Sequence, residues 1–433
     1  MGRRSHQKAA RSASRSPIGT ESSRPGPAPS TDGHFSLDGG FAPALETAGR
    51  GRKRGMPERR IVFVDAARGL AVALALYIHS LATFGSWYRL PLLGQGLVRL
   101  ITSAATPTFV VLFGAMLEMV YYRGLVQGGA ARVRTRLLHR SWSCYVAYLA
   151  TVAASVLGGR RGVLHGVAAA LSLGDSQYGN ILKFYAFALL LAIPLLDFRR
   201  RRGLVPTVVV GLVPWAAVFW LDRVAWPPPS SHLSYLTAML VGRPVGRAWI
   251  SLLHSQALIV VGMTIGWSLS AGSETRRWTV FYRTATIVFL AALAVACAVM
   301  VGLGPRQALA GYLTLRFRAS HHVGYYAFGL LEATTLLIGL SLLLPPRLPY
   351  SARLAPFLCL GRSSLFAFTL GNCLLDFWPR SWQLPVATGF LAGALVPPLV
   401  MCVVLLVDAR LLDPIPARAT PATVPPALRP HEH

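Results

Sequence analysis

Long apolar runs alternate with short polar segments over most of this 433-residue chain. Each run is about 18 to 25 residues long, the length that a helix needs to cross the hydrocarbon core of a bilayer. Lipid offers no hydrogen-bond partner to an open backbone, so helices suit such runs. The pattern predicts an all-α membrane protein with spans at residues 60–82, 97–121, 137–157, 180–197, 203–221, 253–271, 280–303, 325–344, 356–376 and 385–408.

The two ends of the chain differ from its apolar middle. Residues 1–57 are rich in Ser, Pro, Gly and Arg and contain no apolar run, so they are predicted to be disordered. Residues 58–410 form the predicted membrane domain, and residues 411–433 form a Pro-rich tail. The apolar stretch 162–174 is too short for a span and is predicted to be interfacial or re-entrant.

Arginine clusters between the apolar runs predict the orientation. They precede the first span and join the second to the third, the fourth to the fifth and the sixth to the seventh. These clusters fall on one side of the predicted bundle, which the positive-inside rule makes cytoplasmic, and both termini are then cytoplasmic. Topology therefore explains the net charge of +27 better than nucleic-acid binding does. We expect a multi-pass protein of a bacterial inner membrane, with lipid as its surroundings.

Cysteine usage and sequence motifs exclude several kinds of chemistry. No CxxC pair is present, so neither a zinc site nor a disulfide framework is predicted, and no metal is expected. The chain also lacks a GxSxG elbow, a P-loop and an HExxH motif. The cysteines all lie in apolar segments: Cys144, Cys297, Cys359, Cys373 and Cys402.

The first predicted span carries three ionisable residues, Asp65, Arg68 and His79. Such groups are costly in lipid and usually serve function or pair with one another. Arg68 and His79 are about three turns and about 16 Å apart on nearly one helix face. Arg68 can bind the phosphates of a donor, and His79 can act as general base on an acceptor hydroxyl. Alternatively, Arg68 pairs with Asp65 and His79 makes a structural interhelical hydrogen bond.

Further polar residues are expected near Arg68 at the cytoplasmic side. Glu118, late in the second span, either orients Arg68 or forms a structural ion pair. Arg362, which begins the ninth span on the cytoplasmic side, is expected to join Arg68, Arg136 and Arg140 in a basic collar for the phosphates of CoA. For Arg136 and Arg140 the alternative is ordinary positive loop charge.

A second group of polar residues is expected near the depth of His79. Asn372 and Asp376 lie four residues apart in the ninth span, where either can set the tautomer of His79 or contact the acceptor. Asp376 alternatively sits at the membrane interface. His321 and His322, which follow two loop arginines, either bind an anionic acceptor or contribute to catalysis, or they belong to a solvated loop.

Three segments resemble the integral membrane acyltransferases. VDAARGLAVALALYIH (64–79) is similar to the first helix of that superfamily, with its arginine and histidine, and ATPTFVVLFGAML (105–117) resembles the second helix. LGRSSLFAFTLGNCLL (360–375) resembles the late Leu-Gly-Arg-x-Ser-Leu helix, and its continuation is most similar to the OpgC family. The resemblance covers about residues 60 to 410.

The resemblance implies a ten-helix bundle that uses acyl-CoA on the cytoplasmic side and O-acylates a glycan or similar hydroxyl acceptor outside. OpgC proteins place succinyl groups on periplasmic glucans. By motif match, His79 is the catalytic histidine and Arg68 the donor-binding arginine. Ile78 departs from the pattern, because OpgC-type sequences often have an acidic residue there. An N-acetyltransferase of the heparan-glucosaminide type is an alternative of the same class.

Two functions of other classes stay open. A transporter or exporter of a polar solute also places charges within the membrane, usually on broken helices in two related halves. No matching half-repeat is present, and the charges concentrate in the first, second and ninth spans, which favours the enzyme. A non-catalytic membrane scaffold is the third reading, with Ile78 as its only support.

Overall fold

The computed structural model describes residues 61–221, 223–244, 250–344, 355–379 and 381–407, and every regular element in these ranges is a helix. The disorder predicted for residues 1–57 and the tail predicted for 411–433 lie outside the described residues. Seven helical stretches of the described chain are long and apolar enough to cross a membrane. The prediction of an all-α membrane protein is thereby confirmed.

Eight of the predicted spans coincide with single helices. These are α1 (Val62–Thr83), α5 (Ala130–Leu157), α7 (Asn180–Arg202), α8 (Leu204–Leu221), α10 (Leu252–Leu269), α11 (Glu274–Leu303), α14 (Val323–Leu343) and α17 (Val386–Val407). Shorter elements connect them: η1 (Ser86–Arg89), α6 (Val163–Ala170), α9 (Leu233–Val241), α12 (Pro305–Leu313) and α13 (Arg316–Ala319). The stretch 162–174, predicted to be too short for a span, forms the eight-residue helix α6.

The other two predicted spans are broken. The second becomes α2 (Leu92–Thr102), α3 (Ala105–Met116), the π-helix η2 (Leu117–Tyr122) and α4 (Arg123–Val126). The ninth becomes α15 (Ala355–Arg362) and α16 (Ser364–Asp376). At the end of α2 the hydroxyls of Thr102 and Ser103 donate to the carbonyls of Val98 and Leu100. These side-chain bonds compete with the helical ladder where it stops.

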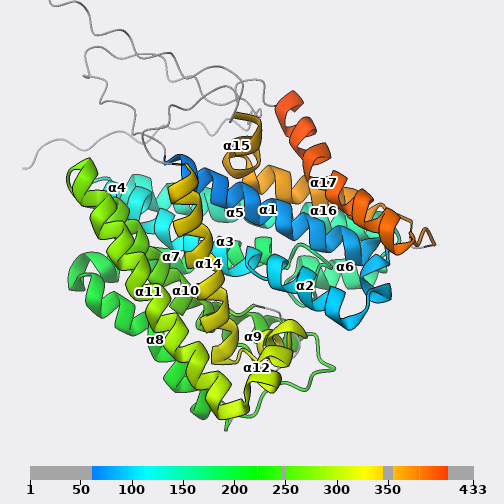
Figure 1. Cartoon of the computed structure of the whole chain (residues 1–433), viewed down its shortest axis with the longest axis horizontal. Helices are drawn as coiled ribbons and strands as arrows, with labels where there is room; N and C mark the ends of the chain where they lie inside the picture. Colours follow the sequence, from blue (N-terminus) through cyan, green and yellow to red (C-terminus); the bar gives the residue numbers. More distant parts are fainter. Residues whose placement is uncertain (1–60, 222, 245–249, 345–354, 380, 408–433) are drawn as a thin grey trace, which may run out of the picture. The chain divides into compact units, whose positions relative to one another are not determined.

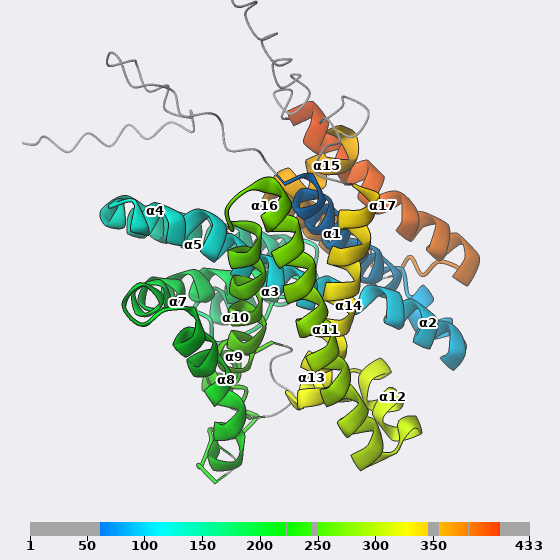
Figure 2. The ribbon, with the colours of Figure 1, turned by 60° about the vertical axis from the view of Figure 1, so that its left-hand side comes forward.

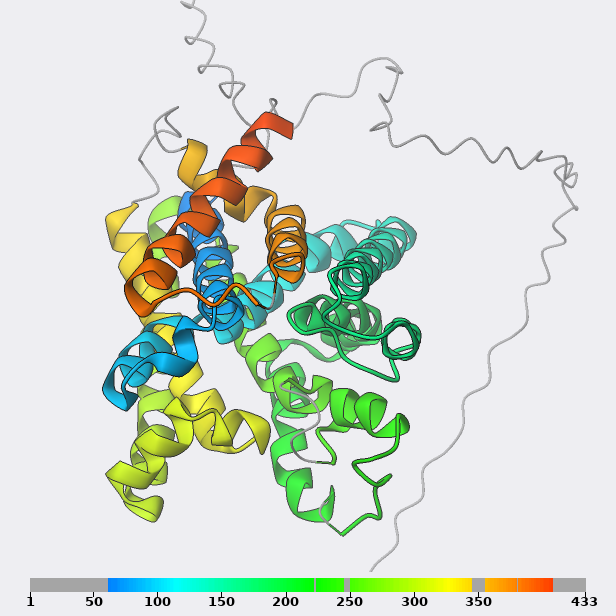
Figure 3. The same cartoon turned by 90° about the vertical axis from the view of Figure 1, so that its right-hand side faces the viewer.

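Helix α1 is the central element of the bundle. It packs against α3, α14, α15, α16 and α17, and Figure 2 shows it, in blue, between α14 and α17. Figure 3 shows the same helix from the side of its C-terminal end, with α16 and α17 in orange beside it. Small residues such as Ala67, Ala71 and Ala75 are buried along it and let these neighbours approach. All residues of α1 except Leu70 are therefore buried or half-buried.

Helices α3 and α10 cross with almost no space between their backbones. A Cβ atom at Gly114 would overlap the carbonyl of Ile259, and one at Gly262 would overlap the carbonyl of Val111. Gly266, one turn after Gly262, lies equally close to Ala115. The crossing is a Gly-xxx-Gly contact of the kind that joins helices in membranes. It fixes α3, and with it one wall of the cavity described below.

The basic connections gather at one end of the bundle. In Figure 1, α4 and the first turns of α1 and α11 lie toward the upper left. Of the predicted cytoplasmic arginines, Arg123 belongs to α4, and Arg276 and Arg277 belong to the first turn of α11. Arg199 to Arg202 end α7, where Arg199 pairs with Glu118 of η2. Helices α2 and α12 contact each other toward the opposite end.

Candidate functional site

A cavity of about 300 Å³ lies beside the second half of α1. Its wall is built by α1, η1, α2, α3, α7, α13, α14 and α16, together with the loop before α7. Apart from tyrosines, the ionisable residues on the described wall are His79, Arg99 and Arg318. A histidine and two arginines therefore line the same cavity.

His79 is held in one tautomer by Asn372. Its Nδ1 lies 2.8 Å from Oδ1 of Asn372, and Nδ2 of Asn372 donates to the carbonyl of Phe368 at 2.9 Å. Because that amide group is committed as a donor, Oδ1 must accept, and Nδ1 of His79 carries the proton. Nε2 then has a lone pair and has no hydrogen-bond partner among the described residues. The arrangement suits a general base that faces the cavity.

The position of Asn372 follows from two contacts of α16. Gly371 leaves room for Leu76 of α1, which would collide with a Cβ there. At the end of α16, the guanidinium of Arg160 donates to the carbonyls of Leu375 at 3.3 Å and Trp378 at 2.7 Å. The carbonyl of Leu375 also accepts from the backbone of Trp378, so Arg160 adds a further donor at the end of the helix. No sequence pattern predicted a role for Arg160.

The ring of Tyr178 covers one face of the His79 imidazole. The rings of His79 and Tyr178 stack with 4.4 Å between centroids. The Tyr178 hydroxyl is hydrogen bonded to Thr83 at 2.7 Å and accepts from Gln177 at 2.8 Å. Burial raises the pKa of Tyr178, so this hydroxyl stays protonated. Tyr178 lies in a polar loop without periodic pattern, and no sequence signal pointed to it.

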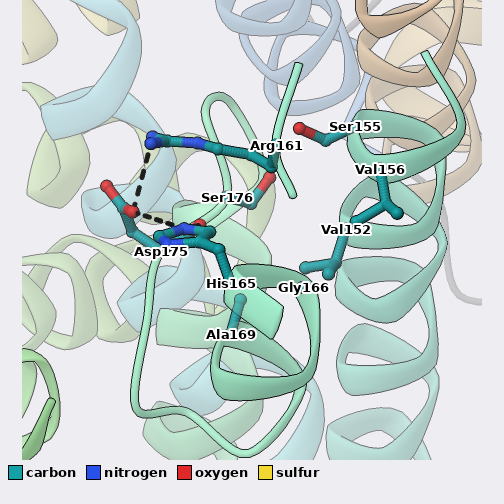
Figure 4. A pocket seen from close by; sticks show the side chains of 9 residues that line it. All are labelled: Val152, Ser155, Val156, Arg161, His165, Gly166, Ala169, Asp175 and Ser176. Atoms are coloured by element: carbon teal, nitrogen blue, oxygen red, sulfur yellow. Dashed lines mark hydrogen bonds and ion pairs between the residues drawn. The ribbon is translucent and has the colours of Figure 1, made fainter. Parts of the chain in front are cut away.

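A polar clasp fixes the loop that precedes Tyr178. Figure 4 shows Asp175 between Arg161 and His165, with carboxylate distances of 3.5 and 3.3 Å. The crevice around them has no room for a ligand. In the next turn the hydroxyl of Ser176 accepts from the backbone of Gly179 at 3.0 Å. The histidine–aspartate pair therefore holds the loop in place rather than forming a second reaction centre.

Asp376 lies one turn beyond Asn372 but outside the cavity wall. It is fully buried, and neither carboxylate oxygen has a hydrogen-bond partner in the described part of the chain. Arg160 and Arg161 lie within electrostatic range of it. The structure brings Asn372, and not Asp376, into hydrogen-bond contact with His79.

A second cluster of polar residues surrounds Arg68 near the start of α1. Nη2 of Arg68 donates to the hydroxyl of Ser364 at 3.0 Å. Asp65, Arg140 and Tyr121 lie within electrostatic range of Arg68.

Tyr121 connects this cluster to the predicted basic collar. Arg68, Arg136 and Arg140 all lie within electrostatic range of its hydroxyl. Arg136 and Arg140 are themselves exposed on α5. Three of the four arginines predicted to form the collar are therefore near neighbours.

Arg362, the fourth arginine, ends α15 beside the first turn of α1. Gly361 packs so closely on the carbonyl of Asp65 that a Cβ would overlap it. The three segments that carry the acyltransferase resemblance thus pack together, because α1 contacts α3, α15 and α16.

Glu118 has a different partner from the expected one. Its carboxylate forms an ion pair with Arg199 of α7 at 2.7 Å, and both residues are buried. The Arg199 guanidinium also lies 4.2 Å from the ring centre of Tyr122. The structure therefore matches the structural ion pair, with Arg199 in place of Arg68.

The two loop histidines are structural. His322 caps α14 by accepting from the backbone of Gly324 at 3.0 Å. His321 is buried against His254, so its loop is not solvated there, and burial lowers the pKa of His321 to about 3. His321 is therefore uncharged at neutral pH and cannot attract an anion, so Arg318 is the charged group that this segment contributes to the cavity.

Replacing Asn372 by leucine is expected to lower kcat of the reaction at His79 about tenfold, the worth of one lost hydrogen bond of roughly 1.4 kcal/mol. Asn372→Asp keeps an acceptor oxygen and should retain more activity than Asn372→Leu. Thr369→Val, one turn earlier, removes a hydroxyl that bonds only within α16 and is the matched control. Equal activity of Asn372→Leu and wild type would contradict the assigned role.

Comparison with protein families gives a match for the first part of the described chain. Residues 60–227 match the family model described as heparan-alpha-glucosaminide N-acetyltransferase, catalytic. No curated protein matches the chain. The matched range includes Arg68, His79 and Tyr178 and ends before α15 and α16. This part of the chain is therefore similar to a membrane acyltransferase-like catalytic domain, a likeness that supports the acyltransferase class and does not single out the OpgC family.

Proposed function

We propose that this protein is an integral membrane O-acyltransferase of a bacterial inner membrane. It transfers an acyl group such as succinyl or acetyl from cytoplasmic acyl-CoA to a hydroxyl group of a glycan or similar acceptor on the outer side. The observation that carries the proposal is the geometry of His79, whose Nδ1 is committed to Asn372 and whose side chain lines a cavity. The motif resemblance to OpgC proteins and the family match of residues 60–227 point to the same class.

The reaction assigns both proton transfers to His79. Nε2 accepts the proton of the acceptor hydroxyl while its oxygen attacks the thioester carbonyl carbon. The tetrahedral intermediate collapses, the carbon–sulfur bond breaks, and the ester is formed. The thiolate of CoA leaves and takes the proton back from Nε2, so His79 ends the cycle neutral. Asn372 accepts from Nδ1–H throughout and stabilises the transient imidazolium.

The cluster around Arg68 suits the donor. Arginine binds phosphate oxygens through a planar fork, and Arg136 and Arg140 add positive charge beside Tyr121. Arg68 and His79 are eleven residues apart on α1, about 16 Å along the axis. An extended pantetheine arm can bridge such a gap, with the nucleotide at Arg68 and the thioester at His79.

Transfer to an amine is the second candidate, and the description of the matching family model favours it. The same histidine would then deprotonate an ammonium or the tetrahedral intermediate instead of a hydroxyl. The two candidates differ in the product, because an ester is cleaved by mild hydroxylamine and an amide is not. Mass spectrometry of the acylated acceptor before and after this treatment separates them.

The test of the proposal is release of CoA from acyl-CoA by the purified protein in detergent, with an extract of envelope glycans as acceptor. Arg68→Met is expected to raise KM for acyl-CoA about 10- to 100-fold, because a charge-assisted contact to phosphate is worth roughly 1.5–3 kcal/mol. Arg132→Met removes an exposed arginine of the same region on α5 and should leave KM unchanged. Absence of CoA release with every donor would favour a transporter or scaffold instead.

A further inference from the structure

Two arginines from distant parts of the chain converge on the cavity that contains His79. Arg99 comes from α2 and Arg318 from α13. Each lies within electrostatic range of His79, and the two lie within electrostatic range of each other. Two like charges that line one cavity repel each other, and an anion between them removes that repulsion.

The described wall of the cavity offers no such anion. It contains no aspartate or glutamate. Glu332 lies behind the wall, where its carboxylate accepts from the hydroxyl of Ser103 at 2.8 Å. No acidic residue of the described cavity wall therefore balances the charges of Arg99 and Arg318.

The guanidinium of Arg99 is positioned by an aromatic ring and retains an N–H donor without a partner among the described residues. Its guanidinium lies 4.5 Å from the ring centre of Trp87, a cation–π contact that fixes the plane of the fork. Its Nε is buried and has no hydrogen-bond partner within the described residues. Such a buried donor is expected to have a partner, and a bound ligand can supply it.

Arg318 approaches the cavity over a second aromatic ring. Its guanidinium lies 5.9 Å from the ring centre of Tyr325, which lines the same cavity. Two guanidinium groups, each placed over an aromatic ring, suit an oxyanion, because arginine binds carboxylate and phosphate oxygens through paired N–H donors.

We propose that Arg99 and Arg318 bind a negatively charged oxyanion group, a carboxylate or phosphate, on the molecule that reacts at His79. This proposal rests on the proposed function. It adds the substrate class: either the acceptor or the acyl group that reacts in this cavity carries a negative charge. The charge is on the outer acceptor or on the far end of the acyl group, and the chemistry of recognition is the same in both cases. The two arginines then select substrate by charge while His79 performs the proton transfers.

The test measures binding rather than turnover and uses two pairs of probes that differ in charge. One pair is trigalacturonate and neutral galactotriose, which represent the acceptor. The other is S-succinylpantetheine and S-butyrylpantetheine, which represent the acyl group and lack the nucleotide that the Arg68 cluster would bind. Affinities are measured by isothermal titration with the full-length protein in detergent, together with the melting temperature of each variant.

The wild type is expected to bind the charged member of one pair at least about tenfold more tightly than the neutral member. Arg99→Met and Arg318→Met should each bring that ratio close to one, and Arg99→Lys should keep part of it. Arg316→Met, on an exposed position of α13, should keep the full ratio. The pair that shows the preference identifies which reactant carries the charge.

A ratio near one for both pairs in the wild type would overturn the inference, as would a ratio that survives in both methionine variants. If a methionine variant does not fold, Arg99→Lys and the wild-type ratios still decide the matter. Binding does not depend on catalysis, so a protein that prefers the charged probe but releases no CoA would support this inference and contradict the proposed function.

Discussion

His79→Ala is expected to reduce acyl transfer by about 100- to 10,000-fold, the usual contribution of a positioned general base. The structure explains why no neighbour should substitute for it. The described cavity wall contains no second histidine and no carboxylate, and its arginines are poor bases. Transfer is measured as CoA release and as labelled acyl group on the acceptor, with the protein kept in the same detergent.

Two further measurements make this result specific. Ile78→Ala removes a neighbouring side chain from the same cavity and should change the rate only severalfold. Truncating His79 enlarges a cavity of about 300 Å³, so added imidazole has room to enter and should restore part of the activity of His79→Ala. A His79→Ala protein with wild-type turnover would remove His79 from the mechanism.

Gly262→Leu is expected to prevent the formation of a stable bundle. The side chain would be forced into the carbonyl of Val111, and backbone atoms cannot rotate away as a side-chain tip does. Gly114 faces the same crossing from α3, so neither helix can yield without separating from the other. We expect a loss of more than about 4 kcal/mol, at the severe end of single substitutions, seen as aggregation or a melting temperature lowered by tens of degrees.

Gly339→Ala is the matched control for this prediction. Gly339 is also a glycine within a long helix, α14, but a Cβ atom there would meet nothing. Its melting temperature should stay within a few degrees of wild type or rise, because alanine favours the helix. Similar behaviour of Gly262→Leu and Gly339→Ala would show that the α3–α10 crossing does not limit stability.

The features that the sequence predicted well are those that the bilayer imposes. A run of apolar residues has to be a helix in lipid, and the helical repeat then places Arg68 and His79 on nearly one face of α1. Asn372 could be placed near the depth of His79 because both lie in the outer halves of spans that begin on the cytoplasmic side. These predictions depend only on how far along a helix axis a residue lies, and the order of residues in the sequence gives that distance directly.

The features that the sequence did not predict depend on which helices are neighbours. Glu118 lies at the depth of Arg68, but the packing of η2 on α7 places it against Arg199. Tyr178 reaches His79 through a loop whose path depends on the Asp175 clasp, for which no pattern exists. Arg99 gave a usable signal, since a lone arginine inside an apolar run is costly, and that signal was overlooked.

The π-helix η2 allows one transmembrane element to face two partners. Tyr121 follows Gly114 by seven residues, and at about 100° per residue a regular helix would bring both to almost the same azimuth. Yet Gly114 faces α10, whereas Tyr121 faces the arginines of α1 and α5. The wider turn changes the angular phase of everything after it, so the helix can keep its contact with α10 while presenting a hydroxyl to the opposite neighbour. Straightening this turn into a regular helix would leave each interface intact by itself but incompatible with the other.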